Sequence, residues 1–188
     1  MKRAEKRNHL VEVAAALFHQ HGYNGVGVDT IIEQAGVAKT TLYRHFPTKV
    51  DLIVAALRHE DEDFRVAMRS YVESKSTEPV DRLLATFDYL ATWLRGTKFY
   101  GCPFMSAASE YSDSRDQVFR EAQMHKKLVL AYFEELAHAI NAENPGRLGS
   151  TINLMHEGAI AVSQITGNED AAHEAKAAAK IAIERELA

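Results

Sequence analysis

Residues 36–49 read Gly-Val-Ala-Lys-Thr-Thr-Leu-Tyr-Arg-His-Phe-Pro-Thr-Lys, and this stretch decides the fold of the chain. Gly36 favours a tight turn after a short helix. Leu42 and Phe46, four residues apart, give the next segment one apolar side that can pack on neighbouring helices. The same segment carries a dense set of hydrogen-bond donors. This combination is typical of the turn and second helix of a helix-turn-helix.

The side chains of this segment suit contact with DNA. Lys39 can donate to guanine O6 and N7, while threonine hydroxyl and methyl groups can contact base edges, phosphates and thymine methyls. Tyr43 and His45 suit phosphate oxygens. Lys49 begins the next helix, where free backbone N–H groups add to its charge. The predicted DNA-binding residues are Lys39, Thr40, Thr41, Tyr43, His45 and Lys49.

Charge is spread unevenly along the 188 residues. The net charge of −4, taken alone, argues against nucleic-acid binding. However, residues 1–50 hold seven Lys or Arg against four acids, a net +3, whereas residues 51–188 hold 15 against 22, a net −7. A basic head on an acidic body indicates a protein that touches phosphates at one end only.

Helical periodicity dominates the chain, and the alternation expected of strands is scarce. Ala, Leu, Glu and Lys are abundant, and the four prolines leave long uninterrupted stretches. The sequence therefore predicts an all-α fold of about nine helices. Gly27 is the expected cap of the second helix, and residues 144–146 are an expected turn. The expected helices cover residues 3–21, 28–35, 38–45, 49–72, 80–94, 103–111, 117–141, a segment that follows the 144–146 turn, and 169–187.

The last two expected helices differ from the others. Apolar residues in the first of them step by four and three positions, the pattern of a helix–helix seam. The second has an alanine-rich stripe, which buries little in a monomer and suits close approach of a partner helix. We expect these stripes to form a dimer, with packing on their own domain as the alternative. The predicted dimerisation residues are Leu148, Ile152, Met155, Ala159, Val162, Ala172, Ala175, Ala179 and Ile183.

The middle of the chain is rich in aromatic side chains with polar tips. Such a set suits a pocket for a mostly apolar ligand, although each residue could equally belong to an ordinary core. The predicted ligand-binding residues are Phe87, Leu90, Trp93, Phe104, Met105, Tyr111, Met124, His125, Leu128 and Tyr132.

Signals for other kinds of protein are weak. Cys102, the single cysteine, excludes an internal disulfide and fits a small buried residue. The histidines do not form the paired Glu-x-x-His motifs of a di-iron site, and no metal or cofactor is expected. No apolar run approaches the roughly 20 residues that span a membrane, so we expect a cytoplasmic protein. We expect no enzymatic activity; a small helical metal-binding or enzymatic protein is the alternative.

The amino-terminal part resembles the DNA-binding domain of the tetracycline-repressor (TetR) family. The resemblance covers about residues 9–57, and its residues are Gly22-Tyr23, Ala35-Gly36-Val37, Thr41-Leu42-Tyr43-Arg44-His45-Phe46 and Lys49-Val50-Asp51-Leu52. The family's usual DNA-contact positions fall on the six residues predicted above. Gly27 stands where the family often has Ser or Thr; it can cap the helix but removes one side-chain contact with phosphate.

The remaining chain also resembles one branch of the family, in residues 101–110 and in residues 148–182, which look like that branch's dimer-forming helices. The resemblance implies an all-helical homodimer that binds a palindromic operator and releases it when a small molecule binds. We thus expect a helix-turn-helix DNA-binding domain in residues 1–50 and a larger ligand-binding and dimerisation domain in residues 51–188. The expected function is a ligand-responsive regulator, most simply a repressor; a constitutive DNA binder without an effector is another alternative.

Overall fold

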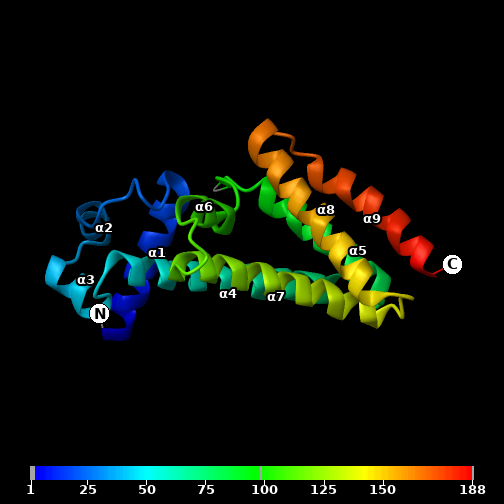
Figure 1. The fold of residues 1–188 in the computed structure, drawn as a ribbon, viewed down its shortest axis with the longest axis horizontal. Helices are drawn as coiled ribbons and strands as arrows, with labels where there is room; N and C mark the ends of the chain where they lie inside the picture. Colours follow the sequence, from blue (N-terminus) through cyan, green and yellow to red (C-terminus); the bar gives the residue numbers. More distant parts are fainter. Residues whose placement is uncertain (1–2, 98, 188) are drawn as a thin grey trace. The chain divides into compact units, whose positions relative to one another are not determined.

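The structure is a computed structural model that describes residues 3–97 and 99–187. Within these residues the chain forms helices and no strand, which confirms the predicted all-α fold (Figure 1). The helices are α1 (Arg3–His21), α2 (Val28–Ala35), α3 (Lys39–His45), α4 (Lys49–Lys75), α5 (Pro79–Leu94), α6 (Pro103–Glu110), α7 (Gln117–Ala139), α8 (Pro145–Thr166) and α9 (Ala171–Leu187). No helix in the described part of the chain is long and apolar enough to cross a bilayer.

The chain divides into two compact units. Unit 1 comprises the described residues of 1–63 and 103–125, and unit 2 comprises those of 64–102 and 126–188. Helices α4 and α7 each contribute residues to both units. The predicted boundary at residue 50, between a DNA-binding domain and a ligand-binding domain, stays a prediction.

Unit 1 is built around the helix-turn-helix. Leu10 and Phe18 of α1, Ile31 of α2 and Leu42 of α3 are buried together, and α1 contacts both α2 and α3. Gly36 closes α2 in the left-handed conformation, with φ 63° and ψ 36°, a geometry that favours glycine. The predicted turn before α3 is therefore present, and α3 contacts both α1 and α2.

Two helix starts show how the sequence sets the boundaries. Gly27 is the N-cap of α2 without a side-chain hydrogen bond, as expected for glycine. The expected turn at residues 144–146 is instead the first turn of α8. Asn144 caps it by accepting a hydrogen bond from the Arg147 N–H at 3.0 Å, and Pro145 occupies the first helical position. Proline is suited to that position because its missing N–H would have no partner there.

Unit 2 is a helical bundle in which α9 lies against α8 and α5, as Figure 1 also shows. Phe87, Leu90 and Phe133 are fully buried in it. The Lys176 ammonium of α9 binds both carboxylate oxygens of Asp88 on α5 at 2.7 Å. This pair fixes the carboxyl-terminal helix to the body of unit 2.

Candidate nucleic-acid interface

Helix α3 has one side in the core and one side in solvent. Leu42 and the following Phe46 are buried at 0% and 2% exposure. Lys39, Thr40 and Tyr43 are exposed, whereas Thr41 and His45 are half-buried. The alternation arises because residues 42 and 46 are one helical turn apart, so the polar residues between them face away from the core.

Lys39, the predicted base-reading cation, is engaged within the protein. Its ammonium donates to Asp29 Oδ1 of α2 at 2.8 Å, and both side chains are exposed. The hydrogen bond and the charge of Asp29 raise the pKa of Lys39, so the ammonium stays charged. To contact a base, Lys39 must exchange this carboxylate for the base. The pairing of Lys39 with Asp29 across the turn was missed from the sequence.

The start of α4 is closed by a capping box. The Thr48 hydroxyl accepts a hydrogen bond from the Asp51 N–H at 3.1 Å, and Asp51 Oδ2 accepts one from the Thr48 N–H at 2.9 Å. Lys49 is half-buried, with its ammonium 6.0 Å from the centre of the Phe18 ring, and partial burial lowers the pKa of Lys49. The six predicted DNA-binding residues thus lie on α3 and the first residue of α4, and three of them are exposed.

Helix α6 holds the turn between α1 and α2. The Glu110 carboxylate accepts hydrogen bonds from the Tyr23 N–H at 2.9 Å and the Asn24 N–H at 2.6 Å. The Tyr23 hydroxyl donates to the Pro103 carbonyl at 3.0 Å. Sequence reasoning missed Glu110 because its partners are 86 and 87 residues away in the chain and no local pattern marks it.

The structure distributes the predicted ligand-binding residues over both units. Phe104, Met105, Tyr111, Met124 and His125 belong to unit 1, and Phe87, Leu90, Trp93, Leu128 and Tyr132 belong to unit 2. Met124 is 53% exposed, whereas Phe87 and Leu90 are fully buried core residues. The ten residues are therefore not gathered in one unit, because helical aromatic spacing marks burial in general and does not distinguish a pocket from a core.

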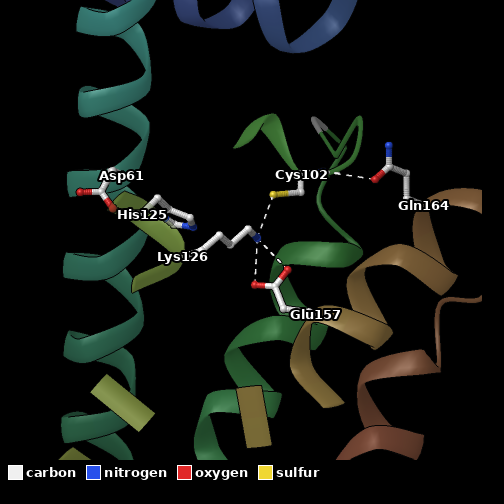
Figure 2. A network of polar contacts seen from close by, with 6 residues as sticks. All are labelled: Asp61, Cys102, His125, Lys126, Glu157 and Gln164. Atoms are coloured by element: carbon white, nitrogen blue, oxygen red, sulfur yellow. Dashed lines mark hydrogen bonds and ion pairs between the residues drawn. The ribbon is translucent and has the colours of Figure 1, made fainter. Parts of the chain in front are cut away.

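Two polar groups from this region are shown in Figure 2. In unit 1, His125 Nδ1 lies 2.8 Å from Asp61 Oδ1, and its ring stacks on Phe104 with centroids 3.6 Å apart. In unit 2, Lys126 binds the Glu157 carboxylate at 2.6 and 2.8 Å and lies 3.4 Å from the Cys102 sulfur. Cys102 is buried, as predicted. Among the described residues, no group of three or more His, Cys, Asp or Glu side chains could hold a metal ion.

Most of the predicted dimer stripe is buried within the single chain. Met155 and Ala175 are half-buried and Val162 is exposed, but the other six predicted residues are buried inside unit 2 of the single chain: Leu148, Ile152, Ala159, Ala172, Ala179 and Ile183. These six pack α8 and α9 within their own unit. The periodicity thus identified a buried face, and a role of this stripe in dimerisation stays a prediction.

A different set of apolar side chains is exposed on the same two helices. We call it the outer α8–α9 face, which comprises Leu154, Val162, Ile165 and Ile181, at 69%, 45%, 83% and 69% exposure. A groove of about 480 Å³ on α8 and α9 includes Ile181 and the half-buried Met155 in its lining. Exposed apolar side chains gathered on two neighbouring helices are candidates for protein association.

Helix α3 has a buried apolar side and a polar outer side, follows α2 through a tight turn, and packs on α1. These features define a helix-turn-helix protein of the DNA-binding class. The model of the bacterial regulatory proteins of the tetR family matches residues 10–56, and the model of the LmrA/YxaF-like transcriptional regulator carboxyl-terminal domain matches residues 79–178. The chain belongs to the tetR family and is a helix-turn-helix transcriptional regulator.

Relatives and solved structures agree with this family. The chain is 30% identical over 173 residues to the HTH-type transcriptional regulator LmrA of Bacillus subtilis, covering 89% of this chain and 91% of that protein. It is 32% identical over 121 residues to the HTH-type transcriptional repressor DhaR of a Mycobacterium species, covering 64% and 60% of the two chains. The crystal structure of SCO4454, a TetR-family regulator from Streptomyces coelicolor, matches with a TM-score of 0.89 and 27% identity over 97% of this chain and 96% of that one.

Proposed function

We propose that this protein represses transcription by binding a palindromic operator as a homodimer, and that a small molecule releases it. The observation that carries the proposal is the exposed side of α3, which presents Lys39, Thr40 and Tyr43 to solvent. Leu42 and Phe46 anchor the opposite side in the core. Repression is supported by the name of the relative DhaR, a transcriptional repressor. Chromosomal DNA as the proposed partner places the protein in the cytoplasm.

A homodimer supplies the second copy of α3 that a palindrome requires. The outer α8–α9 face offers apolar area for this pairing, and burying it in a partner gains about 25 cal/mol per Å². For recognition of successive major grooves, the two α3 helices must lie about 34–36 Å apart, one turn of DNA. The dimer proposal therefore rests on the outer residues of α8 and α9 instead of the six buried ones.

We infer that the effector binds in unit 2, at a site formed from the predicted residues of that unit: Phe87, Leu90, Trp93, Leu128 and Tyr132. Since a ligand shifts a conformational equilibrium only by its difference in affinity between two states, the site must differ between the DNA-bound and released forms. Helix α4 runs from the DNA-binding unit into unit 2 and is the proposed route of the signal. If the core of unit 2 has no space for a ligand, the alternative is favoured in which the protein binds DNA constitutively, without an effector.

Selection of binding sites from random duplexes with the full-length chain tests the proposal. We expect enrichment of a palindrome, and we expect Lys39→Ala to relax base preference while leaving phosphate-driven affinity in place. Enrichment of no palindrome contradicts the proposal. Small molecules that co-purify with the protein and weaken its binding to the enriched duplex identify the effector class.

A further inference from the structure

The first turns of α1 carry two exposed cations, Lys6 and Arg7, next to the helix-turn-helix. We propose that they form a third DNA-contacting element, which binds backbone phosphates beside the groove entered by α3. The inference rests on the proposed function and extends it, because neither residue belongs to the predicted contact set. The proposed partner chemistry is the DNA phosphodiester.

A contact within unit 1 places Arg7 beside the end of α3, and Lys6 precedes it directly on α1. The Arg7 guanidinium lies 5.0 Å from the centre of the Phe46 ring, and Phe46 is the C-cap of α3. Two residues further along α1, His9 Nε2 lies 3.1 Å from the Ala35 carbonyl oxygen at the end of α2. Arg7 lies in the exposed amino-terminal part of α1, before the buried residues that begin at Leu10. Arg7 is thus held close to the end of the recognition helix.

The stability of α1 does not explain these charges. The helix dipole disfavours cations near the start of a helix and favours acidic residues there, such as Glu5 in the first turn of α1. Within the described residues, neither Lys6 nor Arg7 forms an ion pair with a carboxylate, whereas Lys39 is paired with Asp29. Arg7 instead stacks on an aromatic ring, which orients a planar guanidinium while leaving its N–H groups free to bind an oxyanion.

The chemistry predicts a contact without sequence information. A cation on phosphate releases a condensed counterion, so each contact adds about 0.9 to the slope of log affinity against log salt. In a homodimer each residue occurs twice, and removing its charge should lower the slope by about 1.8. The ratio of specific to non-specific affinity should stay unchanged, because phosphates are the same in every sequence.

The test uses fluorescence anisotropy of the full-length protein on a mixed-sequence duplex of about 30 base pairs, roughly three helical turns, from about 50 to 200 mM salt. We expect Lys6→Gln and Arg7→Gln each to lower the slope by about 1.8, and Arg7→Lys to retain most of it. The matched control is Lys127→Gln, which removes an exposed lysine of α7 in unit 2 and should leave the slope unchanged. Thermal melting of each variant checks that α1 remains folded.

The outcomes separate this inference from the proposed function. If Lys6→Gln and Arg7→Gln keep the wild-type slope while Lys49→Gln lowers it, DNA binding stands and the contact by α1 is refuted. If Arg7→Lys loses as much slope as Arg7→Gln, packing on Phe46 rather than charge is responsible, and the inference also fails. If the wild-type protein shows no salt-dependent binding to the duplex, the proposed function itself fails.

Discussion

At the scale of single residues, the ion pair of Lys39 with Asp29 decides how readily the recognition helix can read a base. Both side chains are exposed, so solvent screens the pair and it contributes little to stability. A guanine offering two acceptors can replace one carboxylate at little cost. The pair therefore holds the Lys39 side chain near α2 until DNA arrives, and it adds a negative charge that opposes phosphate.

Asp29→Asn should tighten DNA binding. The substitution removes the ion pair of the Lys39 ammonium and a negative charge near the duplex, so we expect affinity to rise by up to about fivefold. Anisotropy titrations on the enriched duplex measure the effect. Glu33→Gln removes another exposed carboxylate of α2 and is the control for net charge. An equal gain in both variants would show that the ion pair has no specific role.

Glu60 should make stability depend on pH in the sense opposite to a salt-bridged acid. Burial raises the pKa of Glu60, against the opposing effect of the nearby His19 and His59 charges. Between its ordinary value near 4.3 and its raised value, the folded state binds more protons than the unfolded state, so stability falls as pH rises. We expect Glu60→Gln to be more stable than wild type at pH 7 and to lose this advantage near pH 4. Urea unfolding at the two pH values tests this, and an advantage that persists at pH 4 is contrary to it.

At the scale of elements, α6 is a brace for the DNA-binding motif. Its terminal Glu110 binds two backbone N–H groups of the α1–α2 turn, and its first residue, Pro103, accepts from Tyr23. Gly22 in this turn has φ +79°, and a Cβ there would lie 3.0 Å from Glu110 Oε1. The turn and α6 therefore fit closely, so a movement of α6 would displace the turn between α1 and α2.

Glu110→Ala should loosen this turn. Loss of two hydrogen bonds to a charged acceptor, one of them exposed, should lower the free energy of unfolding by about 1–3 kcal/mol. Hydrogen exchange should accelerate at the Tyr23 and Asn24 amides first. Ser109→Ala is the control, since the Ser109 hydroxyl donates only within α6, to the Ser106 carbonyl. Unchanged exchange at both amides in Glu110→Ala would contradict the role of the brace.

Local signals account for what the sequence could predict at this scale. Gly36 and the Leu42–Phe46 spacing fixed the turn and the buried side of α3, since both act within one or two helical turns. The Glu110 contacts and the Lys39–Asp29 pair were missed because they join segments that local patterns do not relate. The stripe containing Ile152 and Ala179 is buried within the chain, and its predicted contact with a partner stays a prediction, because periodicity reports that a face is buried and not which neighbour buries it.

At the scale of the whole molecule, the account requires two chains. The outer α8–α9 face leaves Leu154 and Ile181 at 69% exposure each, unusual for large apolar side chains on helices that already pack against their own unit. We expect Leu154→Glu and Ile181→Glu to convert the dimer to monomers in sedimentation equilibrium. Val66→Glu alters a side chain of similar exposure, 61%, on α4 and should leave the dimer intact. Dimers that persist in both α8–α9 variants would place the interface elsewhere.

A dimer that presents α3 twice on one duplex should be visible in a hydroxyl-radical footprint of the enriched duplex. The account predicts two protected segments related by two-fold symmetry, with centres about one helical turn apart, and loss of the paired pattern in Leu154→Glu. A single protected segment, or a pattern that Leu154→Glu leaves unchanged, would contradict it.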